Sequence, residues 1–77
     1  MNCQVLLLDK PGNLEKVLEI ISEEGANIVT VEHSRYDLSI PIRYARVDMV
    51  LETQSYEHQR RIIERLKKAK YSIQLFK

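Results

Sequence analysis

The stretch Asp9-Lys10-Pro11-Gly12-Asn13-Leu14 lies between two different patterns of apolar residues. Residues 3–8 before it are apolar almost without a break, which is typical of a central strand. After it, apolar residues recur with helical spacing at Leu14, Val17, Leu18 and Ile21. The stretch therefore predicts a corner at which a strand ends and a helix begins.

This corner combines groups of opposite charge. Pro11 suits the first turn of a helix, because its missing N–H group would have no partner there. Asp9 places a carboxylate beside the positive end of the helix dipole. The amides of Gly12, Asn13 and Leu14 have no carbonyl four residues earlier to bond. A helix end that can hold an anion, next to an anionic side chain, suits a small zwitterion such as an amino acid. Ordinary helix capping is the alternative explanation.

The rest of the chain alternates between strand and helix patterns. Gly25 is a suitable left-handed stop for the first helix, and Ser55 is a suitable N-cap for the second. We predict strands at 3–9, 27–37, 43–53 and 71–76, and helices at 13–24 and 56–69. This order is the α+β, ferredoxin-like βαββαβ pattern. We expect one domain over residues 1–77, with an antiparallel sheet of order 4-1-3-2 and both helices on one face.

A second bend, Gly25-Ala26-Asn27-Ile28, leads from the first helix into the second strand. We expect the right-handed crossover to bring Asn27 within reach of the Asp9 turn, where its amide could bind either charge of a zwitterion. An asparagine that is merely tolerated in a turn is the alternative. Further along, His33 falls on the same alternation as Val29 and Val31, and we expect it to be structural, because no second ligand lies near it.

Composition and motifs exclude several classes of function. The longest apolar run is far below the ~18 residues that span a bilayer. No nucleophile motif, phosphate-binding loop or paired metal ligands occur, so we expect neither catalysis nor a cofactor in this chain. The single Cys3 fits a reducing compartment, the cytoplasm. The second helix has a basic face, which is either simply solvated or a nucleic-acid surface. Its cations are Arg60, Arg61, Arg65, Lys67, Lys68 and Lys70.

Nucleic acid is the less favoured partner. RNA-binding modules of βαββαβ topology need aromatic side chains on their two central strands to stack bases. The first strand here has none, and the third has only Tyr44.

The two bends resemble those of the ACT domain, a small regulatory module that senses amino acids, and the likeness covers essentially the whole chain. Other segments resemble the carboxy-terminal ACT domain of threonine dehydratases (threonine ammonia-lyases). They are Val31-Glu32-His33-Ser34-Arg35, Leu51-Glu52-Thr53, His58 and Ala69-Lys70-Tyr71. A complete enzyme of that kind has a pyridoxal-phosphate catalytic domain, which this chain lacks. The chain would therefore be a fragment that works with such a catalytic domain, a separately encoded regulatory subunit, or a free-standing sensor.

The resemblance also implies a site and an assembly. Two copies would pair through edge strands into an eight-stranded sheet and bind an amino-acid effector at their interface. Carried over by position, the ligand-binding residues are Leu7, Asp9, Gly12, Asn13, Leu14, Asn27 and Ile28. Members that bind serine have histidine at position 7 and asparagine at position 9, so Leu7 favours an aliphatic ligand here. Lys70 replaces a frequent glycine before the last strand.

Two functions follow from these observations. In the first, the chain is a dimeric regulatory domain in which Asp9 accepts the ligand's ammonium group. The amides of Gly12, Asn13 and Leu14 hold its carboxylate, and Leu7 with Ile28 flank its aliphatic part. In the second, the chain is a structural dimerisation domain that has lost its ligand.

Overall fold

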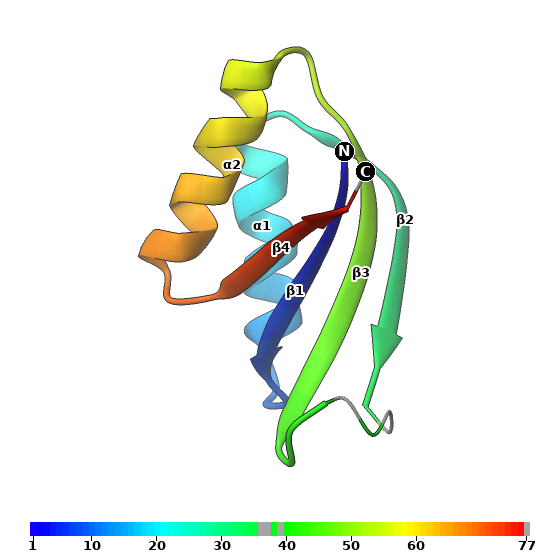
Figure 1. Ribbon diagram of the computed structural model, residues 1–77. Helices are drawn as coiled ribbons and strands as arrows, with labels where there is room; N and C mark the ends of the chain where they lie inside the picture. Colours follow the sequence, from blue (N-terminus) through cyan, green and yellow to red (C-terminus); the bar gives the residue numbers. More distant parts are fainter. Residues whose placement is uncertain (36–37, 39, 77) are drawn as a thin grey trace.

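The structure, a computed structural model, describes residues 1–35, 38 and 40–76. Its elements in chain order are β1 (Asn2–Leu8), α1 (Asn13–Glu23), β2 (Asn27–Ser34), β3 (Tyr44–Glu52), α2 (Tyr56–Lys68) and β4 (Ser72–Phe76) (Figure 1). The predicted βαββαβ order is confirmed, and most bounds agree within one residue. The exception is β2, which was expected to reach residue 37 but ends at Ser34. Residues 36 and 37 lie outside the described residues.

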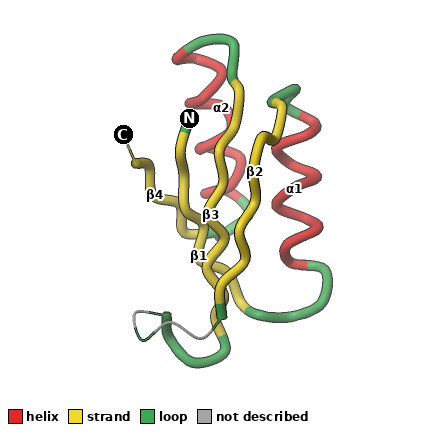
Figure 2. The backbone as a smooth tube through the Cα atoms, turned by 90° about the vertical axis from the view of Figure 1, so that its right-hand side faces the viewer, coloured by secondary structure: helices red, strands yellow, loops and turns green. Residues whose placement is uncertain are grey.

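The four strands form one antiparallel sheet of order β2-β3-β1-β4, as predicted. β1 is central and pairs with β3 on one side and β4 on the other, so the described part of the chain leaves β2 and β4 at the edges. Both helices lie on the same side of the sheet (Figures 1 and 2). Neither α1 nor α2, the helices of the described residues, has the length and apolar character needed to cross a bilayer.

The core lies between the sheet and the two helices. Alternate residues of β1 and β3 face the helices, and α1 and α2 each contribute an apolar stripe. The buried members of this cluster are Cys3, Val5, Leu7, Val17, Ile20, Ile21, Ala45, Val47, Met49, Leu51, Ile62 and Leu66. Burial raises the pKa of the Cys3 thiol to about 11, so this cysteine is a protonated core residue at neutral pH.

The opposite face of the sheet is covered by no helix of the described chain. On this face Leu8, at the end of β1, is 39% exposed. In the middle of this face, Gln4 donates to Asp48 over 3.0 Å, and Arg46 forms an ion pair with the same carboxylate. The second face is therefore a mixed surface with a polar centre.

Backbone geometry at the helix ends follows most of the sequence signals. Gly25 has φ of +82° and ends α1 as predicted, and Ser55 caps α2 by accepting a hydrogen bond from the His58 amide. The placement of Pro11 in the first helical turn was wrong, because α1 begins at Asn13 with Gly12 as its N-cap. Pro11 thus lies in the turn before the helix rather than in its first turn.

His58 joins the two helices at the end of the molecule away from the Asp9 turn. The ring is 2% exposed; its Nδ1 accepts from the Gln54 amide over 3.0 Å, and its Nε2 lies 2.5 Å from the Glu24 carbonyl. A neutral imidazole with its proton on Nε2 satisfies both contacts. His58 therefore ties the start of α2 to the end of α1.

We predict that His58→Ala lowers the free energy of unfolding by about 2–4 kcal/mol, because it leaves two backbone groups unpaired and opens a cavity. Urea denaturation followed by circular dichroism measures the effect. The matched control is His33→Ala, since His33 is exposed and should change stability by less than about 0.5 kcal/mol. Equal effects of the two substitutions would contradict this role.

We also predict that Lys70→Gly stabilises the protein by about 1 kcal/mol. Lys70 has φ of +70°, a left-handed conformation that penalises any residue with a Cβ atom. Thermal unfolding of the two proteins tests this, with Glu64→Gly, at an exposed position inside α2, as a control that should be destabilising.

Candidate functional site

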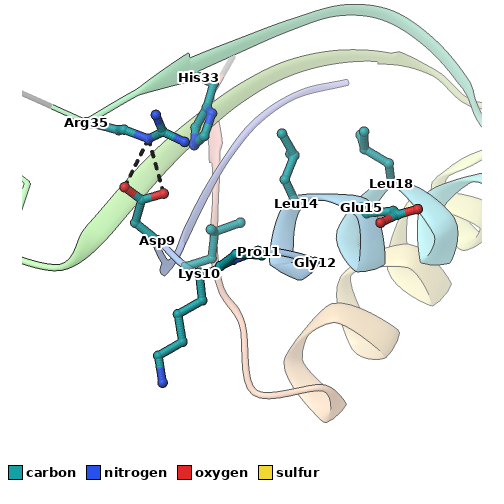
Figure 3. Close-up of a pocket in the computed structure, with 10 residues that line it drawn as sticks. Asp9, Lys10, Pro11, Gly12, Leu14, Glu15, Leu18, His33 and Arg35 are labelled. Carbon is teal, nitrogen blue, oxygen red and sulfur yellow. Dashed lines mark hydrogen bonds and ion pairs between the residues drawn. The ribbon is translucent and has the colours of Figure 1, made fainter.

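An open cleft lies where β1 ends and α1 begins, and it extends to the end of β2 (Figure 3). Its volume is about 690 Å³. The corner residues form one wall, α1 forms the second, and β2 with the residue after it forms the third. The lining residues are Leu7, Asp9, Lys10, Pro11, Gly12, Leu14, Glu15, Leu18, His33 and Arg35. Five of the lining residues come from the stretch 9–14 that the sequence singled out.

An ion pair between Asp9 and Arg35 closes one side of the cleft. The Arg35 Nε lies 2.9 Å from Oδ2 and 3.1 Å from Oδ1 of Asp9, so the N–H group is shared between both carboxylate oxygens (Figure 3). Asp9 follows β1 and Arg35 follows β2, and β3 lies between these strands. The two side chains and the ion pair between them therefore bridge about two strand spacings, on the order of 10 Å. The Arg35 and Asp9 side chains are 50% and 33% exposed.

A β-bulge decides which face His33 and Arg35 take. The pairing of β2 with β3 steps from Ile28↔Leu51 to Thr30↔Val50, so Val29 is an extra residue. Beyond the bulge, His33 pairs with Val47, which belongs to the core face. His33 therefore faces the helix side, and continued alternation gives Arg35 the same side. The sequence-based alternation, which placed Val29 in step with His33, was wrong at this point.

The corner itself differs from expectation at Asn13. Its amide donates to the Lys10 carbonyl over 3.3 Å and its side chain donates to the Leu8 carbonyl over 2.8 Å, so both groups stabilise the turn. No side chain caps the helix start at Gly12, whose φ is +90°. The first-turn amides of Leu14 and Glu15 precede the first helical bond, which Lys16 donates to Gly12. The anion-binding capacity of this helix end therefore lies at Leu14 and Glu15.

The apolar residues of the corner divide between core and cleft. Leu7 is 3% exposed and forms the floor of the cleft, while Leu14 is half-buried in its wall. Leu18, one turn along α1, extends the apolar wall (Figure 3). A ligand in the cleft would thus meet charges at one end and aliphatic side chains beside α1.

The second bend lies elsewhere, and this corrects a prediction. On β3, Asn27 pairs with Glu52 whereas Leu8 pairs with Tyr44, eight positions away. At about 3.3 Å per residue, that is on the order of 26 Å. Asn27 also donates its side-chain amide to Glu52 over 2.5 Å. Within one chain, neither Asn27 nor Ile28 reaches the Asp9 turn, because α1 runs the length of the sheet between the two bends.

Other candidate chemistry is limited. Among the described residues, no three His, Cys, Asp or Glu side chains are grouped to hold a metal ion. On the basic helix α2, Arg61 forms an ion pair with Glu24 at 3.3 Å. Arg65 pairs with both Glu23 and Glu24 of the α1 end, at 2.8 and 3.3 Å. Part of the basic face is therefore neutralised by carboxylates of the same chain.

Comparison with known proteins finds one matching family model and two relatives of the same kind. A family model described as the ACT domain matches residues 1–74. The L-threonine ammonia-lyase of Thermotoga maritima is 36% identical over 55 residues, which are 71% of this chain and 14% of that protein. That of Geobacter sulfurreducens is 34% identical over 77 residues, 100% of this chain and 19% of the protein. The chain thus spans less than a fifth of either relative.

A solved structure with the same fold is the ACT domain from GTP pyrophosphokinase of Chlorobium tepidum. Its TM-score is 0.74 at 15% identity, over 95% of this chain and 91% of that one.

We predict that Asp9→Asn and Arg35→Gln each change the free energy of unfolding by less than about 1 kcal/mol, because partly exposed ion pairs contribute little. Urea denaturation of each variant and of the double variant measures the pair. Leu66→Ala, in the buried core, shows the sensitivity of the assay with an expected loss of about 2–5 kcal/mol. A loss above 2 kcal/mol at Asp9 would mean that the pair holds the fold together.

Proposed function

Because the chain belongs to the ACT domain family, we propose that it is a regulatory module that binds a small aliphatic amino acid and acts as a dimer. ACT homologues occur in enzymes of amino-acid metabolism, among them the two threonine ammonia-lyases. The observation that carries the proposal is the cleft beside Asp9, which combines a carboxylate, a cation and an apolar wall.

The ligand's groups match this cleft one by one. Asp9 accepts a hydrogen bond from the ammonium group, and the free amides of Leu14 and Glu15 receive the carboxylate. The aliphatic side chain lies against Leu14 and Leu18, above the buried Leu7. Hydrogen bonds to charged groups contribute about 1.5–3 kcal/mol each, enough to hold a small metabolite with few contacts.

A second copy offers a place for Asn27. β2 is an edge strand, and two such strands can pair antiparallel about a two-fold axis. If β2 pairs along its whole length, Asn27 of one copy lies opposite Ser34 of the other, next to Arg35 and the cleft. Each site would then be completed by the second bend of the other copy, after its Asn27 releases Glu52. Ile28 would follow Asn27 to the same interface.

Control of a catalytic unit follows from such a shared site. A ligand held between two copies favours one arrangement of the pair over others, and typical coupling energies are about 1–3 kcal/mol. By resemblance to the threonine ammonia-lyases, the controlled unit is a pyridoxal-phosphate enzyme domain or subunit. In this proposal the chain supplies the regulatory site, and catalysis belongs to the controlled unit. A reducing compartment such as the cytoplasm suits its free, buried Cys3.

A structural dimerisation domain is the second candidate, and one observation favours it. Asp9 is already paired with Arg35, and Asn27 with Glu52, so the polar side chains at 9 and 27 each have a partner without a ligand. A nucleic-acid function has less support, since Arg61 and Arg65 of the basic helix are paired with carboxylates of α1.

A thermal-shift screen of the twenty amino acids separates the first two functions. We predict that an aliphatic amino acid raises the melting temperature by several degrees at saturating concentration, because it binds only the folded protein. Asn27→Ala should remove most of that shift, whereas Asn2→Ala, an exposed asparagine on β1, should retain it. Sedimentation velocity should show a dimer.

The outcomes are distinct. If no amino acid stabilises the wild-type dimer, the scaffold function replaces the regulatory one. If an amino acid stabilises wild-type and Asn27→Ala protein equally, the site is not shared between copies.

A further inference from the structure

Arg35 forms an ion pair with the Asp9 carboxylate, the group that would bind the ligand's ammonium. Its Nε contacts both oxygens of Asp9, at 2.9 and 3.1 Å. We propose that Arg35 is an exchangeable counter-ion, which neutralises Asp9 in the empty protein and moves to the ligand's carboxylate on binding. This inference rests on the proposed function, and it explains why the cleft requires both charges of its ligand. The cleft selects molecules that carry an ammonium and a carboxylate on the same carbon atom.

The first support is that the ion pair opens at low cost. The Arg35 side chain is 50% exposed and that of Asp9 33%, so water replaces much of what the pair loses when it separates. The arginine lies beyond the end of β2, outside the strand's ladder of hydrogen bonds. Its head group can therefore shift without breaking regular structure.

The second support is the geometry of the guanidinium. Both contacts to Asp9 use Nε, so the two Nη amino groups take no part in the pair (Figure 3). A guanidinium presents its donors as a planar fork that fits a carboxylate with two hydrogen bonds. An α-amino acid whose ammonium replaces Nε at Asp9 brings its own carboxylate next to this fork. The exchange leaves both Asp9 and Arg35 paired.

The third support is the set of groups around the pair. His33 lies beside Arg35 on the same wall, and Glu15 and Lys10 complete the charged lining (Figure 3). Across the cleft stand the side chains of Leu14 and Leu18, which offer contact to an aliphatic group but none to a charge. A simple amine would leave Arg35 displaced without a partner, and a simple acid would compete with Asp9 for the arginine. Only a molecule with both charges satisfies both residues.

The test compares matched probes on matched variants by titration calorimetry. The probes are L-valine, L-leucine and L-isoleucine, each with the amine that lacks the carboxylate and the acid that lacks the ammonium group. For valine these are isobutylamine and isovalerate. The proteins are the wild type, Arg35→Gln and the control Arg60→Gln. Arg60 is an exposed arginine of α2, and its head group lies 3.8 Å from Glu64.

We expect Arg35→Gln to lower the affinity for the amino acid about 10-fold to 100-fold, since a charge-assisted contact is lost. The same variant should bind the amine at least as well as the wild type does, because Asp9 is freed. Asp9→Asn should give the mirror result, with tighter binding of the acid. Arg60→Gln should change nothing. A merely structural arginine would not change the affinities for the amine and the amino acid in opposite directions.

Other results overturn the inference. If Arg35→Gln weakens amino acid and amine equally, Arg35 supports the cleft without exchanging partners. If it changes neither, Arg35 is not in the site while the proposed function stands. If the wild type and Arg35→Gln both bind no amino acid, the proposed function fails and the exchange with it.

A ligand-free measurement keeps the pair itself falsifiable. The Arg35 Nε proton should give a protected resonance in the empty protein that disappears in Asp9→Asn. Its absence from the wild-type spectrum would overturn the pairing from which the exchange starts.

Discussion

The central position of β1 is the constraint on which the rest of the structure depends. This strand forms hydrogen-bonded ladders on both edges and buries Cys3, Val5 and Leu7 beneath the helices. A one-residue shift of β1 against β3 or β4 would turn these side chains to the open face, so its register is fixed. The chain therefore leaves the sheet at one defined place, and Asp9 is the first residue beyond it. Everything in the cleft is positioned relative to that exit.

The two ends of the sheet serve different purposes. At the end where Asn27 and Glu52 pair, His58 is buried and both its ring nitrogens are bonded, so this end is a closed structural joint. At the other end the Asp9 carboxylate is paired with a half-exposed arginine, while its backbone amide donates to the Arg43 carbonyl. The buried histidine holds the first end together, whereas the ion pair at the second end can separate without breaking regular structure. That division is what a binding module needs.

The sequence predicted the elements well because each rests on local physics. The helical spacing after Asn13, the left-handed stop at Gly25 and the cap at Ser55 act within a few residues, and all are confirmed. The place of Asn27 was missed because it depends on the length of α1, which carries the chain from one end of the sheet to the other.

Arg35 was missed for a different reason. It meets Asp9 across 26 residues of sequence and one intervening strand. Neither partner carries a local signal of that contact. The pairing register of β2 had to be known first, and an irregularity within that strand sets it.

That irregularity makes the cleft depend on how β2 accommodates one residue as well as on side-chain chemistry. Because Val29 is left out of the ladder, His33 meets Val47 of the core face, which is also the partner it would have in a regular strand without Val29. If Val29 instead entered the ladder, every later residue of β2 would slip by one position, and His33 with Arg35 would turn to the face that bears no helices. The side of the sheet that receives the cation is thus set by the backbone at one position outside the cleft.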